Sequence, residues 1–373
     1  MKICMLTTVH PPFDTRIYYK EAVSLAKKYD VVVIAPSDEE IDRVVGDVEV
    51  KSVKKAKNKI FHLLTLWRIF LAGLKEECDV YHCHELGSLF LGVLFKLVKG
   101  TRLVYDVHEH WPSQFLEDIG INDTNIFYNL LERFVLEYER FLSGFSDSIL
   151  AVSESVAERF RDSGKPLWVI LNVPVLQYSL CGDTCNKNPR ELIYMGGKLQ
   201  ASHGVQECYD AVTRLKTDYP DIRLTIVGKL DDRLSQVLRG DNSHFNVTGT
   251  LPYDKMYKRI CEGGIGLVFF QKVTYNMYVG LPNKLFDYMS CGLPVVASDF
   301  PEIRRIVGDC KCGILVGGNA RYDIYGAIHY LIEHPDRARE MGENGKKAVE
   351  ERYNWDRMEE MLFKAYSDSI LII

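Results

Sequence analysis

Residues 278–299, YVGLPNKLFDYMSCGLPVVASD, hold the elements that decide the fold. A glycine and a proline precede a short stretch with helical character, and a Gly-Leu-Pro turn then leads into the apolar run VVAS. A short helix followed directly by a buried strand is typical of parallel sheets, in which helices connect successive strands. The stretch therefore predicts one helix-and-strand unit of an α/β domain.

The same order repeats along the chain. Apolar runs that alternate with helical patterns are KICMLTT, DVVVIAP, DVYHCH, RLVYDVH and SILAVS in the first half, and ELIYMGG, RLTIVGK, FNVTGT, GIGLVFF, PVVASD and CGILVGG in the second. This order implies parallel strands with crossover helices. Because 373 residues exceed what one core usually supports, we expect two doubly wound, Rossmann-like α/β domains that face each other across a ligand-binding cleft.

The irregular, turn-rich residues 172–190 mark the boundary between the two halves. We predict an N-terminal domain over 1–172, a linker over 173–190, a C-terminal domain over 191–352 and a C-terminal helix over 353–373. Packing of this last helix back on the N-terminal domain is one option.

Composition excludes several classes of protein. A net charge of −5 gives no reason to expect nucleic acid as a partner, and no apolar run reaches the length needed to span a bilayer. We expect a cytoplasmic protein, with peripheral contact at the inner face of the cell membrane as an option. The 10 cysteines follow no zinc-site spacing, so reduced thiols are expected.

Glycine-rich turns in the second half are candidate phosphate sites, because glycine lets a ligand approach the backbone. Gly196 and Gly197 precede Lys198, and His203 lies at the far edge of the same loop. The other candidates of this kind are Gly228 and the segment with Thr248 and Leu251, which could present backbone groups to a base. Plain strand-to-helix connections are the alternative.

The stretch quoted first supplies a second candidate. If Pro282 fixes the entry and the helix begins at Asn283, then Lys284 and the first-turn amides, next to Gly280 and Leu281, face an anion. Asp287 lies one turn further on, at about 5 Å, which suits a ribose diol. A solvated surface aspartate is the alternative.

Charged and polar residues of the first half point to the same cleft. In YDVHEHW, Asp106 and His108 follow a strand, and His108 could bond a substrate hydroxyl or act as general base. His82 and His84 end the preceding strand, but no carboxylate spacing completes a metal site. Asp14 is expected to cap a helix near Thr15, and the following arginine contacts phosphate or pairs with Asp14. This arginine is Arg16.

A basic amphipathic segment follows in the first half, with lysines ahead of an apolar helical stripe. We favour packing against the sheet for the stripe and leave contact with an anionic membrane to the lysines. These are Lys51, Lys54, Lys55, Lys57 and Lys59.

Several motifs now match a known family. From HPPFDTRIYYKEAVSLAK through DVYHCHE, YDVHEHWP, AVSESVAERF, VILNVPV and GGKLQASHG to PNKLFDYMSCGLPVVASDFPE and YNWDRM, the chain resembles glycosyltransferase family 4, retaining enzymes of the GT-B fold. The PNKLFxYM form resembles one recognised branch of that family. The resemblance implies sugar transfer from a nucleotide diphosphate sugar without metal, and the sequence contains no D-x-D.

The resemblance also assigns roles to single residues. Lys198 stands where the family has a phosphate-binding arginine, and His203 stands where it has the partner lysine. Asp287 replaces the second Glu of the E-x7-E motif, which holds the ribose, while Val279 replaces the first. His108 corresponds to a histidine next to the reacting sugar, so the catalytic set is His108, Lys198 and Asp287.

We therefore predict a metal-independent glycosyltransferase that needs no cofactor. UDP-sugar is the first choice of donor and GDP-sugar the next, with a glycan or lipid-linked saccharide of cell-surface polysaccharide synthesis as acceptor. A nucleotide-sugar 2-epimerase of the same architecture and a non-catalytic nucleotide-sugar-binding subunit are the alternatives, and Val279 is the best argument for the latter.

Overall fold

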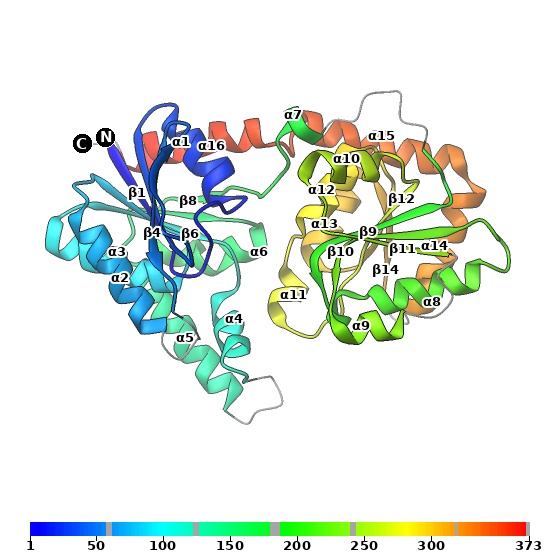
Figure 1. Cartoon of the computed structure of the whole chain (residues 1–373), viewed down its shortest axis with the longest axis horizontal. Coiled ribbons are helices and arrows are strands. Elements are labelled where there is room, and N and C mark those ends of the chain that lie inside the picture. Colours follow the sequence, from blue (N-terminus) through cyan, green and yellow to red (C-terminus); the bar gives the residue numbers. More distant parts are fainter. Residues whose placement is uncertain (57–61, 122–126, 180–186, 239–243, 318–319, 371–373) are drawn as a thin grey trace. The chain divides into compact units, whose positions relative to one another are not determined.

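The structure is a computed structural model of the whole chain (Figure 1). It describes all residues except 57–61, 122–126, 180–186, 239–243, 318–319 and 371–373. The chain divides into two compact units. The N-terminal unit contains residues 1–172 together with 358–373, and the C-terminal unit contains residues 173–357.

The N-terminal unit is built on an eight-stranded sheet with the order β3-β4-β2-β1-β5-β6-β7-β8. Every neighbouring pair is parallel except β3 and β4, which form an antiparallel edge. The strands are β1 (Lys2–Leu6), β2 (Asp30–Ser37), β3 (Asp42–Val45), β4 (Val48–Lys54), β5 (Val80–Cys83), β6 (Arg102–Val107), β7 (Ser148–Ala151) and β8 (Leu167–Val169).

Helices cover both faces of this sheet. Strand side chains alternate between the faces, so that Tyr81 and Cys83 join the core beneath α2, α3 and α5, whereas His82 points to the other face. The helical segments are η1 (Ile17–Ala22), α1 (Val23–Ala26), α2 (His62–Lys75), α3 (Leu86–Lys99), α4 (Trp111–Asp118), α5 (Tyr128–Ser143), α6 (Glu154–Ala157), η3 (Glu158–Ser163) and the end of α16 (Trp355–Ser369).

The C-terminal unit has a six-stranded, fully parallel sheet with the order β11-β10-β9-β12-β13-β14. Its strands are β9 (Glu191–Leu199), β10 (Arg223–Leu230), β11 (Phe245–Gly249), β12 (Ile265–Val268), β13 (Val295–Ser298) and β14 (Gly313–Val316). Its helices are α7 (Leu176–Ser179), η4 (Ala201–His203), α8 (Val205–Leu215), α9 (Asp232–Val237), α10 (Tyr253–Cys261), α11 (Tyr275–Val279), α12 (Asn283–Ser290), α13 (Pro301–Cys310), α14 (Ala320–Glu333) and α15 (Pro335–Glu351).

The predicted α/β class with parallel sheets is confirmed, and each of the eleven apolar runs contains a strand. The strands that the sequence did not reveal are β3, β4 and β8. Strand β3 is mostly exposed, β4 carries two lysines among its seven residues, and β8 has only three residues. Such edge strands lack the buried Val and Ile runs by which central parallel strands are recognised.

Both sheets contain a point at which the strand order reverses. In the N-terminal unit β1 pairs with β2 on one side and with β5 on the other, and in the C-terminal unit β9 lies between β10 and β12 in the same way. Ligands of doubly wound domains bind at the carboxyl ends of the strands at such a point. The topology therefore locates one candidate subsite in each unit.

The basic amphipathic segment differs from its prediction. Lys51 and Lys54 belong to strand β4, and Lys51 forms ion pairs with Glu76 at 2.6 Å and with Glu49 at 2.9 Å. Lys55 is exposed, whereas Lys57 and Lys59 lie outside the described residues.

The predicted packing role of the apolar stripe on α2 is wrong for most of its residues, although Phe70 of the stripe packs against the core. Leu63, Trp67 and Leu71 are 75%, 58% and 40% exposed, respectively. The helix instead packs through a face that contains Thr65, Ile69 and Gly73.

The cysteines largely follow expectation. Of the eight cysteines that the structure describes, seven are free thiols, and most of these are buried. Cys261 is disulfide-bonded, so the expectation of reduced thiols throughout is wrong at that position.

Candidate active site

The first subsite lies at the carboxyl ends of β1, β5 and β6 in the N-terminal unit. Glu85, which follows β5 and is 1% exposed, accepts a hydrogen bond from the Thr7 hydroxyl at 3.0 Å and another from the Thr8 amide. The Glu85 side chain also takes part in the capping box that begins α3. The loop after β1 is thus tied to the start of the helix that follows β5.

A buried ion pair organises the polar side chains of this subsite. The Arg16 guanidinium donates from Nε and Nη2 to the two carboxylate oxygens of Asp106, at 3.1 and 2.9 Å. It also donates from Nη1 to the Ile170 carbonyl at 2.8 Å and forms an ion pair with Glu21 at 2.8 Å. Arg16 is 3% exposed. The predicted phosphate contact of Arg16 is therefore replaced by an internal role, because its donors face buried partners.

The helix that carries Arg16 begins as predicted but has an unexpected pitch. Asp14 caps the start, because its carboxylate accepts hydrogen bonds from the amides of Arg16 and Ile17 at 2.8 and 3.0 Å. The following segment, η1, is a π-helix, in which the Glu21 amide bonds the Arg16 carbonyl five residues earlier at 2.9 Å. This pitch brings Arg16 and Glu21 to one side.

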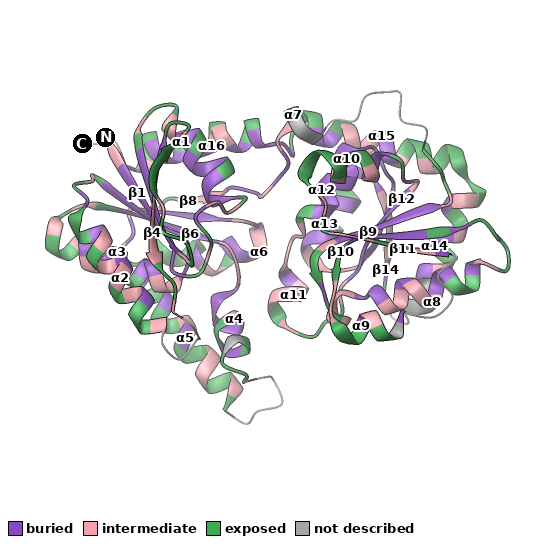
Figure 2. Ribbon diagram, in the orientation of Figure 1, coloured by how far each residue is buried: buried purple, intermediate pink, exposed green. Residues whose placement is uncertain are grey.

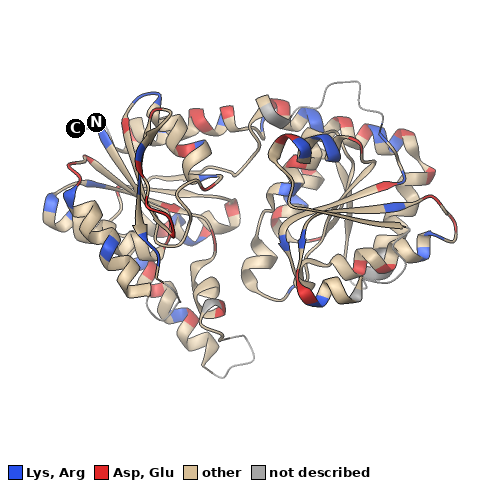
Figure 3. Cartoon of the chain, viewed as in Figure 1, with Lys and Arg blue, Asp and Glu red and all other residues tan. Residues whose placement is uncertain are grey.

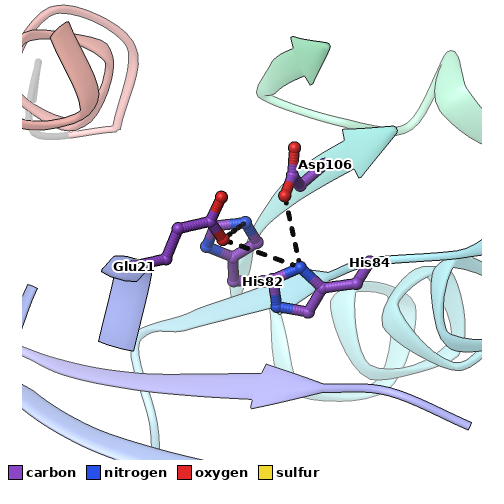
Figure 4. A group of neighbouring side chains, drawn as sticks. All are labelled: Glu21, His82, His84 and Asp106. Carbon is purple, nitrogen blue, oxygen red and sulfur yellow. Dashed lines mark hydrogen bonds and ion pairs between the residues drawn. The ribbon is translucent and has the colours of Figure 1, made fainter. Parts of the chain in front are cut away.

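Four buried side chains, one of which is Asp106 of this ion pair, form a cluster (Figure 4). Glu21 comes from η1, His82 and His84 from β5 and its end, and Asp106 from β6, and one ligand atom of each lies within 4.8 Å of the others. The group has the residue types of a metal site. However, both carboxylates already face the fixed charge of Arg16, at 2.8 to 2.9 Å. A bound cation would share them with this guanidinium, so the cluster does not fit a metal centre.

The two carboxyl groups have opposite pKa shifts. Burial would raise the pKa of Asp106, but the charge of Arg16 and the nearby His108 bring it well below its ordinary value. Burial raises the pKa of Glu21 well above its ordinary value, against the opposing charge of Arg16. The charge of Arg16 is therefore balanced chiefly by Asp106, and Glu21 is the more readily protonated of the two carboxyl groups.

The histidines of the cluster are neutral at pH 7. Burial lowers the pKa of His84 to about 4, and it lowers the pKa of His82 and of His108 as well, although Asp106 opposes the shift at His108. The His108 Nε2 lies 2.7 Å from an Asp106 oxygen, so that nitrogen carries the hydrogen and donates it. The other nitrogen, Nδ1, is then an acceptor suited to a hydroxyl group.

The second subsite lies at the carboxyl ends of β9 and β12 in the C-terminal unit. Gly196, Gly197 and Lys198 continue strand β9 rather than forming the predicted turn. Gly228 on β10 has a φ of +143°, and a Cβ there would lie 1.8 Å from the Gly196 carbonyl oxygen. Only glycine permits this approach of the two backbones. The pair of strands therefore extends past the register shift between Val227 and Lys229.

Lys284 is the buried cation of this subsite. It lies in the first turn of α12, is 7% exposed, and donates from Nζ to the Tyr194 hydroxyl at 3.0 Å. The amine also lies 4.1 Å from the centre of the Tyr194 ring and 4.7 Å from that of Phe270. Burial lowers the pKa of Lys284 to about 7. An anion brought to this amine would favour its protonated form.

His203 lies beside the same aromatic pair. The Tyr194 hydroxyl donates to the His203 carbonyl and, at 2.8 Å, to the Phe269 carbonyl, while the ring of His203 lies 5.6 Å from that of Phe270. The His203 Nδ1 accepts from the Gln200 amide at 3.0 Å, which leaves Nε2–H as a donor in the neutral ring. Burial and the charge of Lys284 lower the pKa of His203. The fold thus brings together two of the predicted phosphate ligands.

Asp287 follows Lys284 on the same helix. Helix α12 begins at Asn283 and Pro282 is its N-cap, as the sequence predicted. Asp287 is 8% exposed and its carboxylate accepts a hydrogen bond of 2.5 Å from the Tyr257 hydroxyl. Burial and the charge of Asp287 in turn raise the pKa of Tyr257. Asp287 is therefore an oriented, buried carboxylate rather than the solvated one that was the alternative.

The remaining predicted residues of the second subsite are more exposed than Lys284 and Asp287. Gly197 and Lys198 are exposed on β9, and Asn283 is exposed at the start of α12. Thr248 is half-buried and donates to the Gly249 carbonyl at 2.9 Å. The remaining predicted residues are Leu251, Gly280 and Leu281, which are partly exposed.

The side chain of Val279 is buried. It ends α11 and is 4% exposed, so an apolar side chain packs where the family has its first glutamate. A cavity of about 410 Å³ opens nearby at the ends of β12, β13 and β14. Its lining includes Gly204, Phe270, Ser298 and Asp299.

Sequence reasoning missed the aromatic and acidic partners of these groups. Glu21 and Arg16 are five residues apart, a spacing that places them on one side of a π-helix but not of an α-helix. Tyr194 and Tyr257 lie inside an apolar strand pattern and on a helix, where no local signal separates them from core aromatics. Asp106 lay inside a quoted motif, but its partner was 90 residues away.

Comparison with known proteins identifies the class of protein that these two units form. Residues 16–173 match the family model described as Glycosyltransferase Family 4, and residues 184–348 match that of Glycosyl transferases group 1. The chain is a glycosyltransferase of the GT-B fold. Within this class it combines an N-terminal region of the first description with a C-terminal region of the second.

One curated relative and two solved structures match the chain over most of its length. An uncharacterised glycosyltransferase of Methanocaldococcus jannaschii is 23% identical, covering 91% of this chain and 90% of its own. The solved sucrose-phosphate synthase of Thermosynechococcus elongatus has a TM-score of 0.76 at 14% identity, with 98% of each chain covered. Anabaena HepE, solved in complex with UDP, has a TM-score of 0.72 at 15% identity and covers 99% of this chain and 100% of its own.

Loss of the buried guanidinium is expected to destabilise the protein strongly. Arg16→Ala leaves the Asp106 charge without its partner inside the unit, at a cost of about 3–5 kcal/mol in the free energy of unfolding. The matched control is Arg161→Ala, because Arg161 is 53% exposed and pairs with Glu154 and Glu158. It should cost less than about 1 kcal/mol. Urea denaturation measures both, and equal losses would contradict the role of Arg16.

Binding of a nucleoside diphosphate at Lys284 is expected to depend on pH. The amine is protonated below its pKa of about 7 and neutral above it, so affinity should fall as pH rises through 7 and upward. Binding above pH 7 should take up a proton, which calorimetry in buffers of different ionisation enthalpy detects. Lys284→Gln should abolish this uptake, whereas Lys255→Gln, at an exposed site on α10, should not. Affinity that does not change between pH 6 and 9 would exclude Lys284 as an anion ligand.

Proposed function

We propose that this glycosyltransferase moves a sugar, with retention at the anomeric carbon, from a nucleotide diphosphate sugar to a glycan or lipid-linked saccharide. UDP-sugar is the preferred donor and GDP-sugar the next. The observation that carries the proposal is helix α12, which presents a buried amine in its first turn and a buried carboxylate one turn later. An anionic group and a diol at that spacing are what the diphosphate and the ribose of such a donor offer.

The diphosphate is proposed to bind between Lys284 and His203. Lys284 gains a full charge when an anion approaches, and His203 donates from Nε2 in either protonation state. Lys198, exposed on β9, supplies a further positive charge from the edge. These groups would stabilise the negative charge that develops on the leaving diphosphate.

The ribose is proposed to bind Asp287. The Tyr257 hydroxyl already fixes the orientation of this carboxylate, so less rotational freedom is lost when a diol binds. The backbone around Gly228, Thr248 and Leu251 is the proposed contact for the base. Anabaena HepE, which shares the fold, was solved with UDP, and this supports the choice of uridine as the first candidate.

His108 is proposed to bond a hydroxyl group of the reacting sugar. Its ring is neutral, and Asp106 holds the tautomer in which Nδ1 accepts. Asp106 in turn is fixed by Arg16, so the orientation of His108 is set by a buried ion pair. The ring thus has the fixed orientation that substrate positioning requires.

Transfer is proposed to proceed without a divalent metal or a cofactor. The sequence has no D-x-D pair, and the cluster that most resembles a metal site is neutralised by Arg16. The lysines and the amide groups at the start of α12 would then carry the charge of the leaving group. Peripheral contact with an anionic membrane through the exposed Lys54 and Lys55 is proposed as well.

The ribose assignment predicts a large loss of affinity in Asp287→Ala. Hydrogen bonds to a charged group contribute about 1.5–3 kcal/mol, so the Kd for UDP or GDP should rise by about 10- to 150-fold. The matched control is Asp254→Ala on α10, an exposed aspartate. Titration calorimetry measures both variants, and an unchanged Kd in a folded Asp287 variant would refute the assignment.

The transfer reaction itself is tested with a panel of nucleotide sugars, with and without saccharide acceptors, in the presence of excess EDTA. The expected product is a glycoside of unchanged anomeric configuration, formed only with acceptor and at the same rate with EDTA. Formation of an epimerised nucleotide sugar without acceptor would show the epimerase instead. Tight binding without turnover on any acceptor would show a binding subunit, for which the buried Val279 is the structural argument.

A further inference from the structure

Among the described residues, half of the exposed large apolar side chains lie on three neighbouring helices of the N-terminal unit. Helix α3 contacts both α2 and α5, so the three form one layer over the sheet (Figure 1). We call their exposed apolar side chains the helical apolar face. It comprises Leu63, Leu64, Trp67, Leu71 and Leu74 of α2, Phe90, Leu97 and Val98 of α3, and Leu130, Phe134, Tyr138 and Phe141 of α5.

Each of these helices has a second apolar stripe in addition to the one that packs on the unit. On α5, Leu130, Phe134 and Phe141 are 67%, 69% and 65% exposed. Its opposite side is buried through Val135 and Leu142. Exposed positions run along the outer sides of the helices in Figure 2. Packing of the sheet does not require this outer stripe, and an exposed patch of this extent marks an interaction site.

Among the three helices of the face, α2 and α3 carry charges of one sign, whereas α5 carries charges of both signs. Helices α2 and α3 contain no aspartate or glutamate, and they carry Arg68, Lys75, Lys96 and Lys99 (Figure 3). Among the ion pairs between described residues, Lys96 is the one of these cations with a carboxylate partner, Asp147 at 2.6 Å. Arg68 and Lys99 donate to backbone carbonyls, which leave their charges intact.

Two further cations extend this charge along the edge of the layer. The Arg68 guanidinium donates to the Lys54 carbonyl at 2.8 Å, so the end of strand β4 lies directly beside α2. Lys54 and the adjoining Lys55 are exposed. Apolar side chains flanked by unneutralised cations complement an anionic lipid surface.

We propose that the helical apolar face docks on an anionic lipid bilayer. Its leucines and phenylalanines enter the boundary of the acyl chains, Trp67 and Tyr138 lie at the level of the headgroups, and the cations contact lipid phosphates. Among the described helices, none is long and apolar enough to cross a membrane. The helices therefore lie in the plane of the interface.

A second copy of the chain is a poorer occupant of this face. A two-fold contact centred on α3 would bring the cations of α2 and α3 close to those of the partner, and the exposed Glu137 of α5 is already paired with Arg140 at 3.1 Å. The proposal goes beyond the contact through Lys54 and Lys55. It includes no residue of either candidate subsite, so its test does not depend on the transfer reaction.

The test is flotation of the full chain with phosphatidylcholine vesicles, with and without phosphatidylglycerol. The chain should float with the anionic vesicles, and Trp67 fluorescence should shift to the blue and be quenched by brominated lipid. Trp67→Ser, Leu97→Ser and Phe134→Ser combined should lower the partition coefficient by at least about tenfold. These side chains are exposed, so folding should persist and is verified by the unfolding temperature.

The matched control combines Val44→Ser and Val247→Ser, which are exposed apolar residues outside the face. This control should bind vesicles like the unchanged chain, and its sedimentation should show a monomer. Equal vesicle binding by the two sets of variants, or no binding by the unchanged chain, would overturn the proposal. A dimer that only the face variants disrupt would overturn it in favour of a second copy.

Discussion

The bidentate contact between Arg16 and Asp106 is the interaction on which the polar interior of the N-terminal unit depends. Three segments far apart in the chain meet there, because the guanidinium binds the end of β6, the η1 residue Glu21 and the carbonyl of Ile170. Without the guanidinium, two buried carboxyl groups would face each other in a low-dielectric interior. With it, Asp106 stays ionised and can hold His108, while Glu21 remains the more readily protonated of the two carboxyl groups.

The C-terminal unit also contains a buried cation and a buried carboxylate, but these two groups have different partners from those in the N-terminal unit. Its buried cation, Lys284, has an aromatic environment rather than a carboxylate partner, and its amine loses its proton near neutral pH. The buried carboxylate on the same helix is held by a hydroxyl group rather than by a cation. One unit therefore contains a paired, permanent charge, and the other contains a cation whose charge depends on what is bound.

Much of the fold and part of the site followed from the sequence. The apolar runs fixed the central strands, and Pro282 before Asn283 located the start of α12 correctly, because such signals are local. The contacts that set the burial and charge of the site residues were not local. Lys284 donates to Tyr194, which is 90 residues away in the sequence, and Arg16 donates to Asp106 across the same separation. The apolar stripe of α2 was misassigned because periodicity shows that a helix has an apolar side but not which side faces the sheet.

The arrangement of α2 has a consequence for how such a helix is recognised. Its inner surface includes one residue without a side chain, Gly73, and a Cβ there would lie 2.9 Å from the ring of Phe95. At this position the backbone therefore approaches the layer beneath it so closely that a larger side chain is excluded. Space thus limits which residue can stand at position 73, whereas Leu66, Ile69 and Phe70 supply the large apolar side chains that pack on the core along the rest of the helix.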